Sequence, residues 1–132
     1  MASKGRGKKG GGKFLALPAI VTNCQQFYGL SGSAAKLLIQ IGEQFNGNNN
    51  GDLQASFNIL RHKGWRSKDT LNRAKKELIK AGFIEETRQG GFCQPARCSL
   101  YALCWHPIHE CRGKLDVYPT KTPSHKWRSK KY

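Results

Sequence analysis

Residues 67–82 read SKDTLNRAKKELIKAG, and this stretch decides the predicted fold. Ser67 is a favourable N-cap, because its hydroxyl can accept a hydrogen bond from a backbone N–H that the first helical turn leaves without a partner. Gly82 is a typical residue for the C-terminal end, because glycine readily adopts the left-handed conformation that ends helices. The stretch therefore predicts a helix over residues 68–81.

The predicted helix has one apolar side and one cationic side. At about 100° per residue, one side of the helix collects Leu71, Ala74, Lys75 and Leu78. The opposite side collects Asp69, Arg73, Lys76 and Lys80, with Thr70 and Asn72 on the flanks. Such a helix can pack on a core while it presents cations and hydrogen-bonding groups to a partner.

The sequence before this helix predicts two further helices. Ser31 or Ser33 can cap a helix that runs to about Phe45, since apolar residues recur there at helical spacing. The run NGNNNG that follows interrupts the chain, because Asn and Gly tolerate positive φ. Asp52 can cap a second helix that ends at Gly64. Its candidate core residues are Leu53, Phe57, Ile59 and Leu60.

The sequence after residue 82 predicts a β-hairpin. Residues 83–87 form a short strand pattern, and residues 99–105 alternate and are rich in Leu, Tyr and Trp, as a returning strand would be. The run RQGG at 88–91 is a turn signal. Three helices followed by a hairpin is the element order of a winged helix-turn-helix. The predicted fold class is therefore α+β, with three helices and a β-hairpin wing over residues 14–111.

Positive charge is concentrated in three segments of this 132-residue chain, which has a net charge of +15. Residues 1–13 hold five bases and no acid, residues 61–80 hold eight bases and two acids, and residues 112–132 hold seven bases and one acid. Such clusters predict a polyanionic partner, with nucleic acid favoured over an anionic membrane surface. We expect residues 1–13 to be a disordered basic tail and residues 112–132 to be a basic C-terminal tail.

Other features of the composition argue against a membrane partner. The chain has no stretch of about 18 apolar residues, and the apolar run after the basic N-terminus is too short for a signal peptide. The tails lack the amphipathic helix that a membrane-surface protein needs. Five cysteines, an odd number, indicate reduced thiols. The expected location is the cytoplasm.

The cationic helix is the predicted reader of duplex DNA, because the second helix of a helix-turn-helix enters the major groove. Asn72 can pair with adenine and Arg73 with guanine, each through two hydrogen bonds. At the helix start, Ser67 and Lys68 lie where backbone N–H groups can meet a phosphate. The other predicted DNA-binding residues are Arg66, Thr70, Lys76 and Lys80 on or beside the helix, and Arg88, Gln89 and Arg97 on or beside the wing.

These segments also carry a family resemblance. Residues 67–84 resemble the recognition helix and following strand of winged-helix proteins such as bacterial regulators and plasmid or phage replication initiators. More narrowly, residues 46–53, 64–71, 87–91 and 99–103 are similar to small phage- and prophage-borne helix-turn-helix proteins. The resemblance implies a winged-helix fold and DNA binding. The chain departs from a minimal wing at residues 91–98, where an insertion leaves the register of the hairpin open.

A group of cysteines and histidines near the C-terminus offers a zinc site as an alternative. Its members are Cys93, Cys98, Cys104, Cys111, His106 and His109. No C-x2-C pair occurs among them, and Cys98 and Cys104 would stand about 20 Å apart on a regular strand. We therefore predict no metal and no other cofactor. An enzyme is not predicted either, because nothing orients a Cys–His pair and no phosphate-binding glycine loop follows a strand.

Two alternatives to DNA binding remain open. An RNA-binding protein could use the tails, with Trp127 and Tyr132 stacking on bases. A phage protein could instead inhibit a host factor by protein–protein contact. A homodimer would fit two half-sites, although no long heptad helix is present. The prediction is a non-enzymatic phage or mobile-element regulator of transcription or replication that reads duplex DNA with the helix over residues 68–81.

Overall fold

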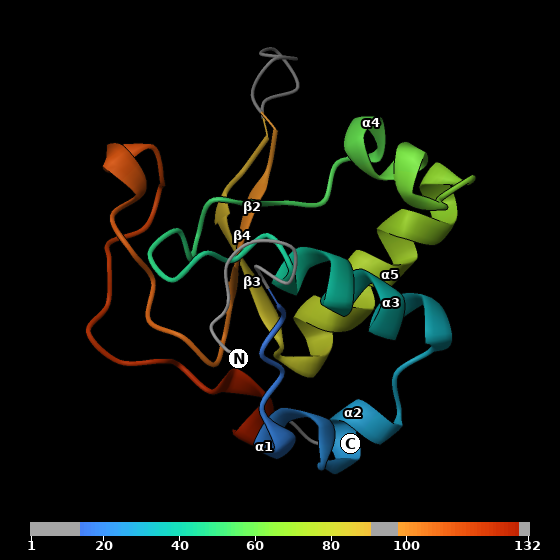
Figure 1. Cartoon of the computed structure of the whole chain (residues 1–132), viewed down its shortest axis with the longest axis horizontal. Coiled ribbons are helices and arrows are strands. Elements are labelled where there is room, and N and C mark those ends of the chain that lie inside the picture. The colour runs from blue at the N-terminus through green and yellow to red at the C-terminus, as the bar shows by residue number, and fades with distance from the viewer. Residues whose placement is uncertain (1–13, 91–97, 130–132) are drawn as a thin grey trace, which may run out of the picture.

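The structure is a computed structural model, and it describes residues 14–90 and 98–129. Helices α3 and α5 lie on one side of a three-stranded antiparallel sheet, and the chain that follows β4 runs along the other side (Figure 1). The elements are α1 (Ala19–Thr22), α2 (Gln25–Tyr28), α3 (Gly32–Gly42), β2 (Leu53–Gln54), α4 (Phe57–Leu60), η1 (Arg61–Lys63), α5 (Lys68–Ala81), β3 (Ile84–Arg88), β4 (Leu100–Leu103), η2 (Cys111–Gly113) and η3 (Lys126–Ser129). This mixed architecture confirms the α+β class.

The two longest helices begin and end where local sequence signals place them. The Ser67 side chain accepts a hydrogen bond from the Thr70 N–H at 3.2 Å, and Gly82 ends α5 with a φ of +90°. The bounds of α5 therefore confirm the helix predicted over residues 68–81. Ser31 caps α3 in the same way, through the Ala34 N–H. This helix is shorter than expected, because it ends at Gly42 rather than near residue 45.

The helix predicted to begin after Asp52 is wrong at its start. Leu53 and Gln54 instead form strand β2, which pairs with Tyr101 and Leu100 of β4. Helix α4 follows as a single turn, and Ile59, a predicted core residue, is 41% exposed. The difference arises because β2 forms only by pairing with β4, a strand far along the chain. Local sequence patterns do not predict such a pairing.

Strands β3 and β4 form the predicted antiparallel hairpin. Ile84 pairs with Leu103 at its base, and the register is irregular between Glu86 and Arg88. All four residues of β4 are buried, because it is the central strand of the order β2-β4-β3 and is covered on both faces. Residues 91–97, which include the inserted part of the wing, lie outside the described residues.

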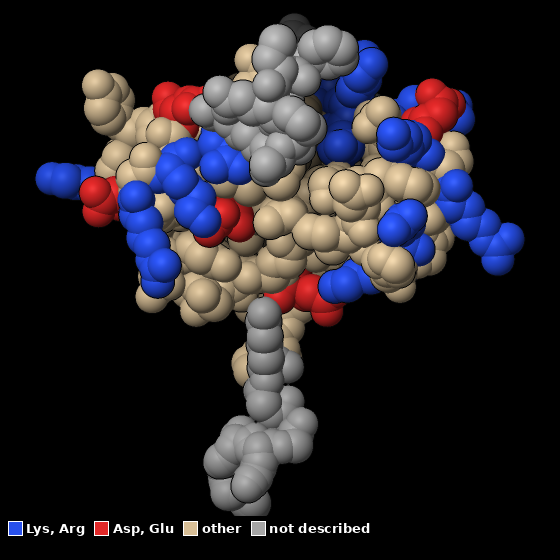
Figure 2. All heavy atoms as spheres, turned by 90° about the horizontal axis from the view of Figure 1, so that it is seen from above, with Lys and Arg blue, Asp and Glu red and all other residues tan. Residues whose placement is uncertain are grey.

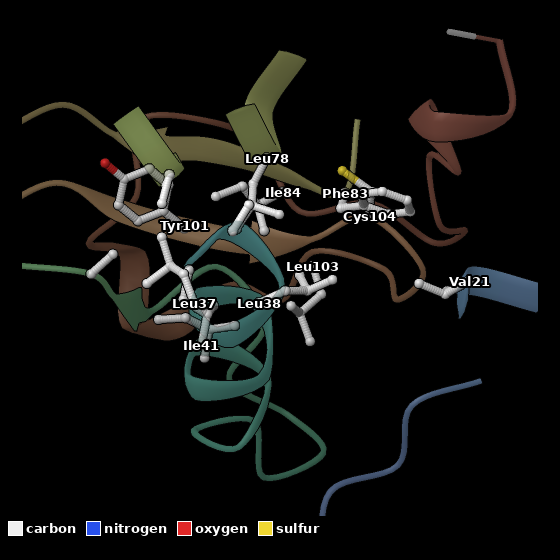
Figure 3. Close-up of a cluster of buried hydrophobic side chains, with 14 of the residues drawn as sticks. Val21, Leu37, Leu38, Ile41, Leu78, Phe83, Ile84, Tyr101, Leu103 and Cys104 are labelled. Carbon is white, nitrogen blue, oxygen red and sulfur yellow. The ribbon is translucent and has the colours of Figure 1, made fainter. Parts of the chain in front are cut away.

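Apolar side chains from the helices and the sheet meet in one core (Figure 3). Helix α5 contributes Leu78 and β3 contributes Ile84. The other labelled members from α3 and β4 are Leu37, Leu38, Ile41, Tyr101 and Leu103. None of the helices within residues 14–90 and 98–129 is both long and apolar enough to cross a membrane.

The segment after residue 111 differs from the predicted basic tail, because residues 112–129 pack on the domain. The Trp127 side chain is 1% exposed and stacks on Phe83, with 5.8 Å between ring centroids. Backbone hydrogen bonds attach the segment to the domain, including those from the Asp116 N–H to the Thr87 carbonyl and from the His125 N–H to the Cys104 carbonyl, both at 2.8 Å. In this structure the Trp127 side chain is therefore not exposed for the base stacking that the RNA-binding alternative considers. Residues 130–132, with Tyr132, lie outside the described residues.

One buried amide joins the Asn-rich loop to the chain after β4. Asn50 is fully buried, and its side-chain Nδ2 donates to the carbonyl oxygens of Leu103, His106 and Pro107 at 2.9–3.1 Å. Its Oδ1 accepts from the Leu103 N–H at 2.7 Å. The Asn50 side chain thus provides hydrogen-bond partners for backbone groups at the end of β4 and in the chain that follows it.

We expect Asn50→Ala to lower the free energy of unfolding by about 1–3 kcal/mol, because it leaves the buried Leu103 N–H without its acceptor. Urea denaturation followed by tryptophan fluorescence measures the loss. Asn48→Ala is the matched control, since Asn48 lies in the same loop and is exposed. Equal stability of the two variants would show that the Asn50 contacts contribute nothing.

Candidate nucleic-acid interface

Helix α5 turns one side to the core and the other to solvent. Leu71, Ala74 and Leu78 are buried, which confirms the apolar side that the sequence predicts. The exposed side carries Lys68, Asn72, Arg73, Lys76 and Lys80. We call these five residues the α5 outer face. They extend over nearly the whole length of a 14-residue helix.

Lys75 marks the edge of this face next to β3. It is half-buried, and burial lowers the pKa of its ammonium group, while the nearby carboxylate of Glu86 acts in the opposite direction. The sequence predicts Lys75 on the apolar side of the helix, and its half-burial agrees with that position. It therefore separates the core side of α5 from the outer face.

A hollow of about 230 Å³ lies at the start of α5. Its lining consists of Ser33, Lys36, Gly64, Trp65, Arg66, Ser67 and Thr70. The Lys36 ammonium group donates to the Gly64 carbonyl at 3.3 Å and lies 5.1 Å from the centroid of the Trp65 ring. Two cations thus stand beside a helix N-terminus, whose partial positive charge also favours anions.

Trp65 fixes the turn that precedes α5. Its side chain is 5% exposed, and its Nε1–H donates to Gln40 Oε1 at 2.6 Å. The Gln40 Nε2 in turn donates to the Lys63 carbonyl at 3.1 Å. These contacts hold the turn on α3 and bring Lys36 beside the start of α5. Sequence reasoning missed Lys36, because helical spacing in α3 marks only the residues that face the core.

Basic side chains gather on the side of the molecule that carries α4 and α5, at the right of Figure 2, and form a second group on the opposite side. Within the described residues, none of Lys68, Lys76 and Lys80 is paired with an acid. On the opposite side, Lys114 pairs with Asp52 at 3.0 Å, and Lys126 pairs with Glu85 at 2.9 Å. Lys68, Lys76 and Lys80 therefore keep their charge free for a partner, whereas Lys114 and Lys126 each have an acid beside them.

Arg73 is the member of the α5 outer face that has an acidic partner. Its Nη2 lies 3.0 Å from Asp69 Oδ2, one turn earlier on the helix. The Arg73 side chain is 73% exposed, and that of Asp69 is 78% exposed. The guanidinium group therefore stays accessible to a partner while one of its edges is held.

The described wing residues, Arg88 and Gln89, make contacts away from the α5 outer face. Arg88 is half-buried, and its Nε and Nη2 donate to the Cys98 carbonyl at 3.2 and 2.9 Å, which joins the two strands at the end of the hairpin opposite its base. Gln89 is exposed, and its backbone N–H donates to Asp116 Oδ2 at 3.3 Å. Arg97 lies outside the described residues.

The cysteines and histidines considered for zinc make contacts with other groups of the protein where the structure describes them. Cys104 is buried, and burial raises the pKa of its thiol to about 11. The Cys111 thiol donates to the Asn50 carbonyl at 3.6 Å, and His109 Nδ1 accepts from the Asn50 N–H. Among residues 14–90 and 98–129, no three His, Cys, Asp or Glu side chains are placed to hold a metal ion. Cys93 lies outside this part of the chain.

The structure therefore gathers eight of the predicted site residues at one place. They are Arg66, Ser67, Lys68, Thr70, Asn72, Arg73, Lys76 and Lys80. Lys36 joins them from α3, whereas Arg88 is engaged within the hairpin. The chain matches no protein-family model, no curated protein and no solved structure.

Proposed function

We propose that this chain is a non-enzymatic winged-helix protein that binds duplex DNA by placing α5 in the major groove. The observation that carries the proposal is the α5 outer face, which combines four cations with one side-chain amide. An α-helix with its side chains is about 10–12 Å across, and the major groove of B-form DNA is about 12 Å wide. The outer face of α5 thus has both the dimensions and the chemistry that the groove requires.

The order of the elements supports the same proposal. Helix α4 and η1 directly precede α5, where the proposal requires the first half of a helix-turn-helix unit, and the hairpin of β3 and β4 directly follows α5. The strands of the hairpin extend toward the same end of the molecule as α4 (Figure 1). A wing in this position would reach the DNA backbone next to the groove that α5 enters.

The side chains of the interface divide into two proposed roles. Asn72 and Arg73 read base edges, because amide and guanidinium groups form two-bond contacts with adenine and guanine. Lys68, Lys76 and Lys80 bind phosphates and orient the helix without reading sequence. The hollow at the start of α5 is a further phosphate contact. By its resemblance to small phage proteins, the chain would regulate transcription or replication of a phage or mobile element.

We expect the full-length chain to bind random duplex DNA more tightly than single-stranded DNA or duplex RNA of equal length. The major groove of A-form RNA is deep and narrow, so a helix cannot enter it. Fluorescence anisotropy with labelled oligonucleotides measures the three affinities across a salt series. The logarithm of the duplex affinity should fall linearly with the logarithm of the salt concentration, since phosphate contacts release counterions.

A chain lacking residues 1–13 is the control for the basic N-terminus. It should show a shallower salt dependence, because residues 1–13 supply five of the cations. It should keep the preference for duplex DNA, because the proposed interface lies on α5. Tighter binding to RNA would overturn the proposal in favour of an RNA-binding protein. Binding to none of the three would favour a protein partner.

A further inference from the structure

Asp69 is an acid on a surface that is otherwise cationic. Helix α5 contains one other acid, Glu77, whose carboxylate accepts from the Ser31 N–H at 2.6 Å and from the Ser31 hydroxyl at 2.8 Å. Glu77 is therefore used to join α5 to the start of α3. Asp69 does not join two elements in this way, because its side chain is 78% exposed and its ion-pair partner is the exposed Arg73 of the same helix.

On a surface that approaches phosphates, this carboxylate weakens binding. Like charges repel, and the repulsion between Asp69 and the DNA backbone applies to every sequence alike. The ion pair with Arg73 and the place of Asp69 in the first helical turn each contribute little to stability, since both are exposed to solvent. A cost to affinity for so small a gain in stability suggests that Asp69 acts on the choice of sequence.

The geometry of the Asp69–Arg73 ion pair suits a role in the choice of DNA sequence. The Arg73 guanidinium has five N–H donors in one plane, and Asp69 engages Nη2 at 3.0 Å. The remaining donors can form the two-bond fork that guanine O6 and N7 accept. A guanidinium that is already held along one edge loses less rotational freedom when it binds the base.

We propose that Asp69 is a positioning residue for sequence reading, which orients Arg73 toward guanine and penalises sequences that do not bind it. This inference rests on the proposed function of α5. When guanine is present, Arg73 bridges the base and the Asp69 carboxylate, so the acid stays compensated within the groove. When guanine is absent, Asp69 still holds Arg73 against the base edge, where the remaining guanidinium donors lose water without finding the two acceptors of guanine, and discrimination increases.

The test compares three single variants and one double variant of the chain with the wild type. Asp69→Asn removes the charge and keeps the size of the side chain. Glu43→Gln is the matched control, because Glu43 also forms an exposed ion pair, with Lys63 at 3.9 Å, away from Arg73. Arg73→Ala removes the proposed reader itself. Each chain selects binding sequences from a randomised duplex DNA library, and anisotropy then measures the affinity for a selected and a random duplex.

We expect Asp69→Asn and Glu43→Gln both to bind random duplex DNA somewhat more tightly, since each loses one negative charge. Only Asp69→Asn should lose discrimination for guanine, by about threefold or more of the roughly 5- to 150-fold that a two-bond contact supplies. Adding Asp69→Asn to Arg73→Ala should then cause no further loss of discrimination, because Asp69 acts through Arg73.

Unchanged selected sequences and unchanged discrimination in Asp69→Asn would overturn the inference and leave DNA binding by α5 intact. An equal loss in Glu43→Gln would also overturn it, since the effect would then be one of net charge. Failure of the proposed function gives a different result, in which the wild type itself shows no affinity for duplex DNA. A wild type that binds duplex DNA without enriching any sequence would exclude base reading by both Asp69 and Arg73.

Discussion

Replacing Trp127 with alanine is expected to lower the free energy of unfolding by about 3–5 kcal/mol, the usual range for removing a large aromatic side chain from a core. Trp127 is 1% exposed and contacts the rings of Phe83, Trp105 and His125. It stacks on Phe83 at 5.8 Å and meets Trp105 edge-on at 6.3 Å between centroids. Alanine would leave a cavity that these rings cannot close without leaving their own contacts.

Urea denaturation of the variant and the wild type measures this loss. Tyr118→Ala is the control, because Tyr118 belongs to the same segment and is 90% exposed. We expect Tyr118→Ala to stay within about 0.5 kcal/mol of the wild type. A Trp127→Ala variant as stable as this control would mean that residues 112–129 form the basic tail that the composition predicts.

The loss of the Trp127 side chain should also disturb the proposed interface on α5. At Gly82, which ends α5, an added Cβ would lie 2.6 Å from the Trp127 backbone nitrogen. The chain around Trp127 thus closes against the C-terminal end of the helix that carries the outer face. A truncation before residue 127 would remove a core residue as well as positive charge, so binding by such a fragment would not isolate the role of the tail.

Replacing Lys68, Lys76 and Lys80 together with alanine is expected to cause the largest loss of duplex DNA binding. For every lysine–phosphate interaction that the substitutions remove, the slope of log affinity against log salt should become shallower by about 0.9. The weakening should be similar for selected and random duplexes, because phosphate contacts do not distinguish sequences. Anisotropy across a salt series measures both the affinity and the slope.

The charge-matched control replaces Arg112, Lys114 and Lys121, three exposed bases on the opposite side of the molecule. It removes the same net charge, so general electrostatic attraction falls equally in both variants. We expect a much smaller change in slope for this control, because its residues do not lie on α5. Equal losses of affinity in the two triple variants would show that no particular face of the chain binds DNA and would overturn the proposed interface.

The sequence by itself determined α5 and its two sides. Ser67 and Gly82 are local signals, and the spacing of Leu71, Ala74 and Leu78 requires only the period of a helix. The exposure of the outer face follows from the same period. Predictions of this kind succeed because each depends on residues within one or two helical turns. The hairpin strands are predictable for a similar reason, from short alternating runs on either side of a turn signal.

The tertiary structure alone decided the contacts between distant parts of the chain. Strand β2 forms because β4 offers it hydrogen bonds, Asn50 is buried because three carbonyls converge on it, and Trp127 enters the core from a segment whose charge suggests a tail. Lys36 reaches the start of α5 only because Trp65 holds the turn on α3. Local patterns cannot show such contacts, since their free energy comes from surfaces that meet only after the chain has folded.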